Sequence, residues 1–197
     1  NQETRPLGFG PSWEGSMVLI PWYLYQYTGD TTLLERYYQP IKKYLQHLER
    51  NSKGNLLNFG IDDHKAYYTK TDGEIIASAY YHYLTDLFVQ MADILENDDD
   101  SKYYSKLTSS IQKAFQDKYY DKKKKVFGNA GQTSLSNAIY MKLVPEKDRQ
   151  QVLNNLLQNI DSANYHFDAG VGGVKALYEA LSETNQDKIL YQMVNKR

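Results

Sequence analysis

The feature that most constrains this chain is the alternation of two kinds of helical segment along its length. Apolar residues recur at helical spacing almost throughout, and no segment shows a convincing period of two. One kind is apolar or aromatic around much of its circumference, as buried helices are, and occurs near 16–28, 74–96, 133–143 and 171–181. The other kind is amphipathic with one charged face, and it follows near 31–51, 101–117, 146–160 and 185–195. The sequence therefore predicts an all-α fold of about four hairpins, each with an inner and an outer helix.

Repeated inner–outer hairpins are typical of α/α toroids, in which neighbouring hairpins bury a shared core. A closed (α/α)6 toroid has about twelve helices, whereas eight are expected here. We therefore expect residues 1–197 to form a single domain portion, a partial (α/α)6 toroid or barrel, with residues 1–12 leading into the first helix. Because the chain begins at Asn1 rather than Met, we expect a mature form or a piece of a longer protein.

Composition disfavours several classes of function. A formal net charge of −1 argues against a general electrostatic attraction to nucleic acid or to an anionic membrane, so neither is expected as a partner. The one basic run, 122-KKKK-125, follows 117-DKYYD-121 and is interpreted as a solvated turn. The absence of cysteine excludes a disulfide framework, a thiolate nucleophile and a cysteine-based zinc site. No apolar run approaches the ~20 residues that a membrane helix needs.

The alternation of helices also predicts where the functional loops lie. If every inner helix runs in the same direction, the four loops that precede the inner helices meet at one end of the ring. These loops are 12-SWEGS-16, 58-NFGIDDHKAYYTKTDGE-74, 127-FGNAGQTS-134 and 164-NYHFDAGVGG-173. They hold the densest set of aromatic, carboxylate, imidazole and amide groups in the chain, whereas the loops at the opposite end are short. Long, chemically rich loops at one end predict a binding cleft there.

The first two loops supply five candidate binding residues. Trp13 could be a platform for a sugar ring or a cap that packs on the following helix. Glu14 could bind or activate a ligand, or could be a first-turn residue of the kind favoured at a helix start. Asp62, Asp63 and His64 form the strongest local cluster, and the alternative is a polar turn with an Asx cap.

The last two loops supply three more candidates. Gln132 could donate a hydrogen bond to a ligand hydroxyl or could neighbour a helix cap. His166 and Asp168 flank a phenylalanine before a glycine-rich turn, and both a ligand contact and a structural role remain open. His47 and His82 fall inside helical segments and are interpreted as structural.

Other chemistries match the sequence less well. The run 170-GVGG-173 lacks the spacing of nucleotide-binding loops, there is no HExxH motif, and nothing resembles a nucleophile elbow. Asp62, Asp63, His64 and His166 match no known metal-site spacing, so neither a metal nor another cofactor is expected. Carboxylates beside aromatic side chains do suit glycoside hydrolysis, in which two carboxyl groups flank the scissile bond.

Five blocks of the sequence match the motifs of one known protein family in the same order. The stretch 11-PSWEGSMVLIPWYLYQYTGD-30 is similar to that family's P-x-W-G-(D/S)-A segment with its following (I/V)-P-W and G-D. The stretch 59-FGIDDH-64 resembles its G-L-G-D-W segment, and 74-EIIASAYYHYLTDLFVQMADIL-95 resembles its next helix. The stretch 132-QTSLSNAIYMKLVP-145 resembles Q-T-x-x-A-L, and 166-HFDAGVGGVKAL-177 resembles H-(L/I)-x-T-G-(F/I)-x-G-T. In these ordered blocks, which cover most of the chain, the sequence resembles the bacterial α-L-rhamnosidases, glycoside hydrolase family 78.

The resemblance implies an (α/α)6 six-hairpin glycosidase barrel and metal-free, inverting hydrolysis of terminal α-L-rhamnose. It implies that Trp13 is an aromatic wall of the sugar pocket, that Asp63 is the aspartate of G-D-W, and that Gln132 and His166 line the pocket. Two positions depart from the pattern: His64 stands where the family has Trp, and Gly15 stands where many members have Asp.

The catalytic carboxylates of the family have no counterpart in this chain. The general acid of the family lies in a D-x-x-x-x-E segment before the first block, and its general base lies in an A-T-T-x-W-E segment after the last one. Neither segment is present, so the catalytic residues remain unknown. The resemblance implies that remaining parts of a longer chain supply them, that the partner is an oligosaccharide or rhamnosylated glycan, and that the protein is periplasmic or secreted.

Two alternatives remain open. The chain could be a non-catalytic helical toroid that binds a glycan or a protein. It could also belong to another (α/α)6 glycosidase or lyase, with Glu14, Asp62 or Asp63 as a catalytic carboxylate.

Overall fold

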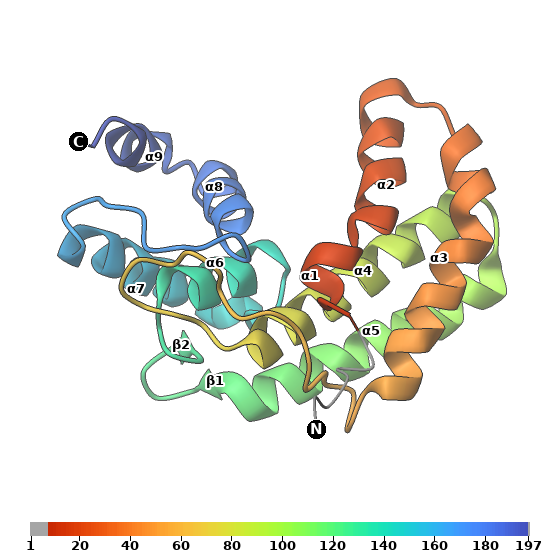
Figure 1. The fold of residues 1–197 in the computed structure, drawn as a ribbon, viewed down its shortest axis with the longest axis horizontal. Coiled ribbons are helices and arrows are strands. Elements are labelled where there is room, and N and C mark those ends of the chain that lie inside the picture. The colour runs from red at the N-terminus through yellow and green to blue at the C-terminus, as the bar shows by residue number, and fades with distance from the viewer. Residues whose placement is uncertain (1–7, 197) are drawn as a thin grey trace.

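The computed structural model describes residues 8–196, which fold into an arc of paired helices (Figure 1). The helices are α1 (Pro11–Glu14), α2 (Ser16–Thr28), α3 (Thr32–Asn51), α4 (Gly73–Ile94), α5 (Asp98–Tyr119), α6 (Gln132–Tyr140), α7 (Arg149–Ser162), α8 (Val174–Glu183) and α9 (Asp187–Val194). The eight helices from α2 to α9 lie within three residues of their predicted bounds at each end. The predicted all-α class and the four inner–outer hairpins are therefore confirmed for the described part of the chain.

Four short elements were not predicted. Helix α1 is a single turn with Pro11 at its first position, where a missing N–H costs nothing. A 3-10 turn, η1 (Glu146–Asp148), precedes α7. Strands β1 (Tyr120–Asp121) and β2 (Val126–Phe127) pair antiparallel, and two residues per strand are too few to show alternation in the sequence.

The lysine run at 122–125 forms the turn of this hairpin, as predicted, but it is not wholly solvated. The Nζ atom of Lys125 lies 2.9 Å from Oδ1 of Asp148, and the Lys125 side chain is 31% exposed. The hydroxyl of Tyr120 donates a 2.9 Å hydrogen bond to the other carboxylate oxygen of Asp148. The hairpin is thus fastened to the start of α7.

Inner and outer helices differ in burial as their sequences indicate, with one exception. Helix α4 is buried along most of its length, whereas α3 buries one stripe against it: Leu34, Tyr38, Ile41, Leu45 and Leu48. The exception is α2, which was expected to be buried around its circumference but exposes a line of large apolar side chains: Met17, Ile20, Leu24 and Tyr27. Helix α2 borders the open side of the arc, facing α8 across it (Figure 1), so no described helix covers this line. None of the described helices is both long and apolar enough to cross a bilayer.

The core consists of two hydrophobic clusters that share α4. Residues near the start of α4, such as Ile76, pack with α6 to α9, and residues near its end, such as Phe88, pack with α2, α3 and α5. Tyr83, midway along α4, packs against both clusters. Helix α4 is therefore the element that joins the two halves of the arc.

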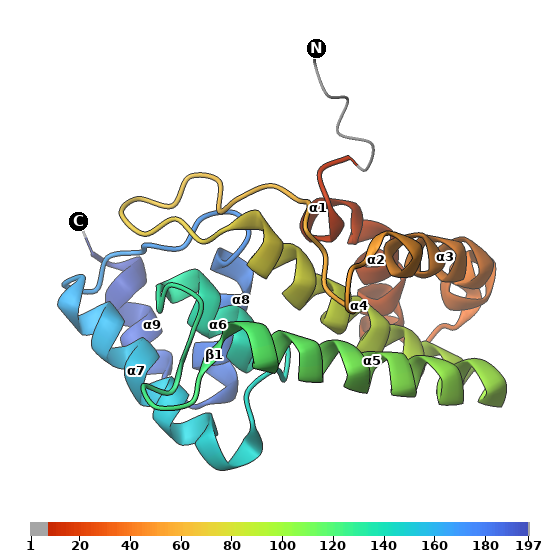
Figure 2. The ribbon, with the colours of Figure 1, turned by 90° about the horizontal axis from the view of Figure 1, so that it is seen from below.

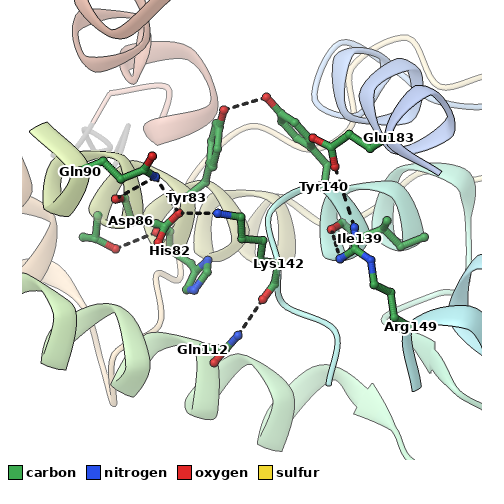
Figure 3. A network of polar contacts seen from close by, with 11 residues as sticks. His82, Tyr83, Asp86, Gln90, Gln112, Ile139, Tyr140, Lys142, Arg149 and Glu183 are labelled. Atoms are coloured by element: carbon green, nitrogen blue, oxygen red, sulfur yellow. Dashed lines mark hydrogen bonds and ion pairs between the residues drawn. The ribbon is translucent and has the colours of Figure 1, made fainter. Parts of the chain in front are cut away.

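Polar contacts cross the seam between these clusters (Figure 3). The hydroxyls of Tyr83 and Tyr140 lie 2.7 Å apart, and Nζ of Lys142 lies 3.4 Å from the carboxylate of Asp86. The side-chain amide of Gln112 on α5 donates to the carbonyl of Lys142 at 2.7 Å. These bonds connect α4, α5 and the turn after α6.

Candidate functional site

The four loops that precede the inner helices form one continuous rim, as the sequence predicted. We define the rim as residues 8–15, 58–73, 127–131 and 163–173. The first loop joins the second because Ile61 N donates to Phe9 O at 3.2 Å, and the fourth joins the second because Val171 N donates to His64 O at 2.8 Å. Figure 2 shows α1 with the second and fourth loops on the same side of the molecule.

The third loop is held to the second by Asn129. Its side-chain nitrogen donates to Lys70 O at 3.0 Å, and its side-chain oxygen accepts a 3.3 Å hydrogen bond from the hydroxyl of Thr71. All four loops are therefore connected by direct hydrogen bonds. The geometric expectation behind the candidate residues, that these loops gather at one end, is confirmed.

A cavity of about 1150 Å³ opens at this rim. Its walls come from Gly8, Phe9 and Trp13 on one side and from residues 58–66, 70 and 72–74 on the other. Four predicted site residues lie in these walls: Trp13, Asp62, Asp63 and His64. The other four, Glu14, Gln132, His166 and Asp168, belong to the rim or its edge but lie outside the described lining of the cavity.

Trp13 and Phe9 form an aromatic corner at the cavity. Their ring centroids are 6.5 Å apart with the planes tilted by 55°, and the side chains are 57% and 62% exposed, respectively. Trp13 belongs to α1, whose turn begins after Gly10 at a φ of 83°, a left-handed conformation that favours glycine. A Cβ at Gly10 would also lie only 2.8 Å from the backbone of Gly60. The glycine thus lets the first and second loops approach closely enough to form the corner.

Glu14 points its carboxylate toward protein partners. One oxygen accepts a 3.0 Å hydrogen bond from Phe9 N, and the other accepts a 3.3 Å hydrogen bond from the hydroxyl of Tyr44 on α3. Burial and the neighbouring Glu14 carboxylate raise the pKa of Tyr44, so this hydroxyl stays a donor. In this structure Glu14 fixes the turn that carries Phe9 and Trp13.

Asp63 is the buried carboxylate of the cavity wall, with only 1% of the residue exposed. Its Oδ2 atom accepts a hydrogen bond from the hydroxyl of Thr133 at the start of α6. Its Oδ1 atom is buried and has no hydrogen-bond partner of good geometry among the described residues. Burial raises the pKa of Asp63, and this effect is opposed by Thr133 and by the nearby backbone amides of Gly170 and Gly172.

The glycines of the run 170–173 allow the fourth loop to pack closely against Asp63. A Cβ at Gly170 would lie 2.6 Å from Oδ1 of Asp63, and a Cβ at Gly173 would lie 2.2 Å from the hydroxyl of Thr133. The run 170–173 therefore reflects close packing around a carboxylate.

Asp62 and His64 flank Asp63 on the exposed side of the loop. Asp62 accepts a 3.1 Å hydrogen bond from the backbone N–H of Gly73 and forms a 2.7 Å ion pair with Lys70. Asp62 thus closes the second loop on itself at the first residue of α4, and this hydrogen bond between distant residues is not the local contact of an Asx turn. His64 is exposed, and its backbone carbonyl receives the hydrogen bond from Val171.

Gln132 and Asp168 are buried braces between loops. The Gln132 amide donates to His166 O at 3.0 Å and accepts from Asp168 N at 2.9 Å, and Gln132 has no exposed surface. Asp168 is 4% exposed, and its Oδ1 accepts from the backbone amides of Tyr68 at 2.5 Å and Thr69 at 3.0 Å. In this structure the side-chain amide of Gln132 and Oδ1 of Asp168 bond to protein partners, and a direct contact of either residue with a ligand stays a prediction. His166 itself is exposed at the rim.

Sequence reasoning missed Phe9, Lys70 and Thr133 as members of the site. Phe9 lies between two glycines, Gly8 and Gly10, and that pattern could have marked an aromatic residue on a tight loop. Lys70 and Thr133 act through contacts with residues far along the chain, for which no local signal exists. Among residues 8–196, no group of three or more His, Cys, Asp or Glu side chains is arranged to hold a metal ion.

The paired helices and the rim together define a helical-hairpin domain with a polar, aromatic-edged cavity at the loop end. This is the architecture of the six-hairpin glycosidases, and the model of the bacterial alpha-L-rhamnosidase six-hairpin glycosidase domain matches residues 2–197. The chain belongs to this family.

Individual relatives agree with the family match. An alpha-L-rhamnosidase of Streptomyces avermitilis is 30% identical over 186 residues, covering 94% of this chain and 18% of that protein. An alpha-L-rhamnosidase of Formosa agariphila is 27% identical over 190 residues, covering 92% of this chain and 20% of the relative. The chain thus spans about a fifth of the length of these curated relatives.

Solved structures show the same fold. The crystal structure of Streptomyces avermitilis alpha-L-rhamnosidase complexed with L-rhamnose superposes with a TM-score of 0.87 at 28% identity, over 94% of this chain and 18% of that one. The alpha-L-rhamnosidase from Dictyoglumus thermophilum gives a TM-score of 0.88 at 30% identity, over 95% of this chain and 22% of that one. The partial six-hairpin barrel expected from the resemblance is therefore confirmed.

Proposed function

We propose that this chain supplies part of the sugar-binding cleft of an α-L-rhamnosidase that hydrolyses terminal α-L-rhamnose with inversion. The cavity at the rim would receive the terminal sugar of an oligosaccharide or rhamnosylated glycan. The membership of the chain in the rhamnosidase family supports this assignment, and so does the chemistry of the cavity wall.

The observation that carries the proposal is the buried carboxylate of Asp63. A buried polar atom without a partner is costly, and ligand sites are where such atoms are retained. Oδ1 of Asp63 is such an atom in a cavity wall. A sugar hydroxyl would donate a charge-assisted hydrogen bond to it, and the other oxygen would remain fixed by Thr133.

The aromatic corner supplies the second half of sugar recognition. A pyranose presents an apolar C–H face as well as hydroxyls, and an exposed indole ring offers a flat apolar surface against which that face can pack. Trp13 would provide this surface, with Phe9 tilted beside it. Asp62 and His64 would offer further polar contacts from the exposed part of the same loop.

The remaining candidates would act on the cleft in other ways. Gln132 and Asp168 would hold the loops in place, and Glu14 would hold the turn under Trp13. The exposed His166 would face ligand at the far edge of the rim. An inverting reaction also needs a general acid and a general base about 6.5–9.5 Å apart, and we assign these to other parts of a longer polypeptide.

Hydrolysis by the full-length protein tests the proposal. An aryl α-L-rhamnoside should be cleaved in preference to aryl glycosides of other sugars. Because the reaction inverts the anomeric carbon, β-L-rhamnose should be the first product seen by proton NMR. The variant Asp63→Asn should lower the affinity for L-rhamnose, measured by titration calorimetry, by about ten- to a hundred-fold, since hydrogen bonds to charged groups contribute about 1.5–3 kcal/mol. Asp93→Asn, an exposed position near the end of α4, is the matched control and should bind as the wild type does. Turnover of a different glycoside alone would refute the assignment.

A further inference from the structure

Two adjacent tyrosines are exposed on the second loop of the rim, directly after the cavity-lining residue Ala66 in the sequence. Tyr67 and Tyr68 are 76% and 75% exposed, and their rings meet edge to face with centroids 4.4 Å apart. The second loop therefore continues from the cavity wall into an exposed aromatic pair.

The loop that carries this pair is held at its base. Gly73 N donates to Asp62, and Asp63 N donates to Thr71 O at 3.0 Å, so the two ends of the loop are joined. Ala66 N donates to Asp63 O at 3.3 Å, which closes a turn over residues 63–66.

The tip of the loop is held as well. The buried carboxylate of Asp168 accepts hydrogen bonds from the backbone amides of Tyr68 and Thr69, directly at the aromatic pair. A carboxylate that is 4% exposed is desolvated at a cost, and here it fixes the backbone of an otherwise exposed tip. Exposed rings on a backbone fixed in this way can bind a ligand with little further loss of conformational entropy.

The cavity has room for more than one sugar ring. Its volume of about 1150 Å³ exceeds the roughly 300–1,000 Å³ typical of pockets for drug-sized ligands. If a terminal sugar is held at Asp63 and Trp13, the next ring of the glycan would lie near the part of the second loop that follows Ala66. Tyrosine suits that place because its ring packs on a C–H face while its hydroxyl forms hydrogen bonds with water or sugar.

We propose that Tyr67 and Tyr68 form an accessory platform for the pyranose ring that is linked to the terminal sugar. The inference rests on the proposed function, because it places the terminal sugar in the rim cavity. The platform would select glycans over free monosaccharides and would contribute affinity without touching the bond that is cleaved.

Calorimetry on the full-length protein separates the platform from the terminal-sugar site. The two ligands are L-rhamnose and a thio-linked α-L-rhamnosyl glucoside, which is not hydrolysed during the titration. The wild type should bind the disaccharide more tightly than the monosaccharide. The double variant Tyr67→Ala/Tyr68→Ala should bind L-rhamnose unchanged and the disaccharide about ten-fold more weakly, which is the size expected for loss of aromatic contacts.

Matched variants make the result specific. Tyr27→Ala removes a ring that is 88% exposed at the opposite end of α2, and it should change neither affinity. Tyr67→Phe/Tyr68→Phe keeps the rings and should keep most of the preference for the disaccharide.

Three outcomes would overturn the platform. An unchanged disaccharide affinity in the double alanine variant would show that the rings make no contact. An equal loss of affinity for both ligands would show that the tyrosines only support the loop. Failure of the wild type to bind L-rhamnose at all would overturn the proposed function together with this inference, whereas the first two outcomes leave the proposed function intact.

Discussion

The hydroxyl groups of Tyr83 on α4 and Tyr140 on α6 lie 2.7 Å apart at the seam between the two hydrophobic clusters. The hydroxyl of Tyr23 on α2 lies 3.3 Å from the first and 3.4 Å from the second. Lys175 on α8 completes the group, with Nζ 3.4 Å from the Tyr140 hydroxyl and 4.9 Å from the centre of the Tyr23 ring. One residue from each inner helix therefore enters a single polar network.

This network should contribute measurably to stability. Tyr140→Phe removes the hydroxyl shared by three partners, and we expect the free energy of unfolding to fall by about 1–2 kcal/mol in urea denaturation. Tyr104→Phe is the matched control, because the Tyr104 hydroxyl is buried without a hydrogen-bond partner among the described residues. That variant should be neutral or slightly stabilising. Equal losses in both variants would contradict a special role for the network.

Lys175 should control the acidity of Tyr23. Burial raises the pKa of Tyr23, but hydrogen bonds from Lys175, Tyr140 and Tyr83 outweigh it and hold this pKa below the ordinary value of 10. Lys175→Met should therefore raise the pKa of Tyr23. The measurement is the ultraviolet absorbance of tyrosinate against pH, taken as the difference from the same protein carrying Tyr23→Phe. An unshifted difference curve would show that the lysine does not act on this phenol.

His82 should make the domain sensitive to mild acid. Burial lowers the pKa of His82 from 6.5 to about 4, so the folded state holds this imidazole neutral while the unfolded chain takes up a proton. The ionisation of His82 therefore leaves the free energy of unfolding unchanged above pH 6.5. As the pH falls from 6.5 toward 4, it lowers this free energy by about 3 kcal/mol in total. His82→Gln should flatten the dependence of unfolding free energy on pH in this window. An unchanged slope in His82→Gln would contradict this role of His82.

Asp168 should determine the order of the loop that carries Tyr67 and Tyr68. Asp168→Ala removes the acceptor for two backbone amides, a loss of about 1.5–3 kcal/mol if the tip opens. Hydrogen exchange at Tyr68 and Thr69 should then accelerate by about ten- to a hundred-fold. Asp161→Ala, an exposed change at the end of α7, should leave both amides protected. Unchanged exchange in Asp168→Ala would show that the tip is held by other contacts.

The two tryptophans should separate binding from stability. Trp13→Ala removes a ring that is 57% exposed, so we expect a melting temperature close to that of the wild type and L-rhamnose binding weakened about ten-fold. Trp22→Ala removes a ring that is 6% exposed and should lower the free energy of unfolding by about 3–5 kcal/mol. A large fall in melting temperature with unchanged binding in Trp13→Ala would assign Trp13 to the core.

The helices could be predicted because apolar periodicity is a local property of the sequence. Residues such as Leu34, Ile41 and Leu48 recur on one side of a single helix, and the structure buries that side. The exposure of Ile20 on α2 could not be predicted, because burial depends on which neighbour covers a helix. The same applies to the β1–β2 hairpin, which has too few residues to leave a pattern.

The gathering of the loops could be predicted, but the role of each side chain in them could not. Gln132 begins α6 directly after a polar loop, Asp63 lies within another polar loop, and both residues are buried. Gln132 has both polar atoms bonded to residues more than thirty positions away, whereas one oxygen of Asp63 has no hydrogen-bond partner of good geometry among the described residues. That distinction depends on long-range hydrogen bonds, which have no signature in the local sequence.

Because each inner helix begins at the rim, the N-termini of α2, α4, α6 and α8 all lie at the same end of the molecule. Each helix carries a partial positive charge of about half a unit at that end, and the four helices add their fields there. The acidic residues around the cavity, Asp62, Asp63, Asp72 and Glu74, thus lie in a region whose backbone already offsets part of their charge. Lys70 and Lys118 pair with two of these carboxylates, so the helix ends and the lysines together offset the acidic charge of the cavity wall.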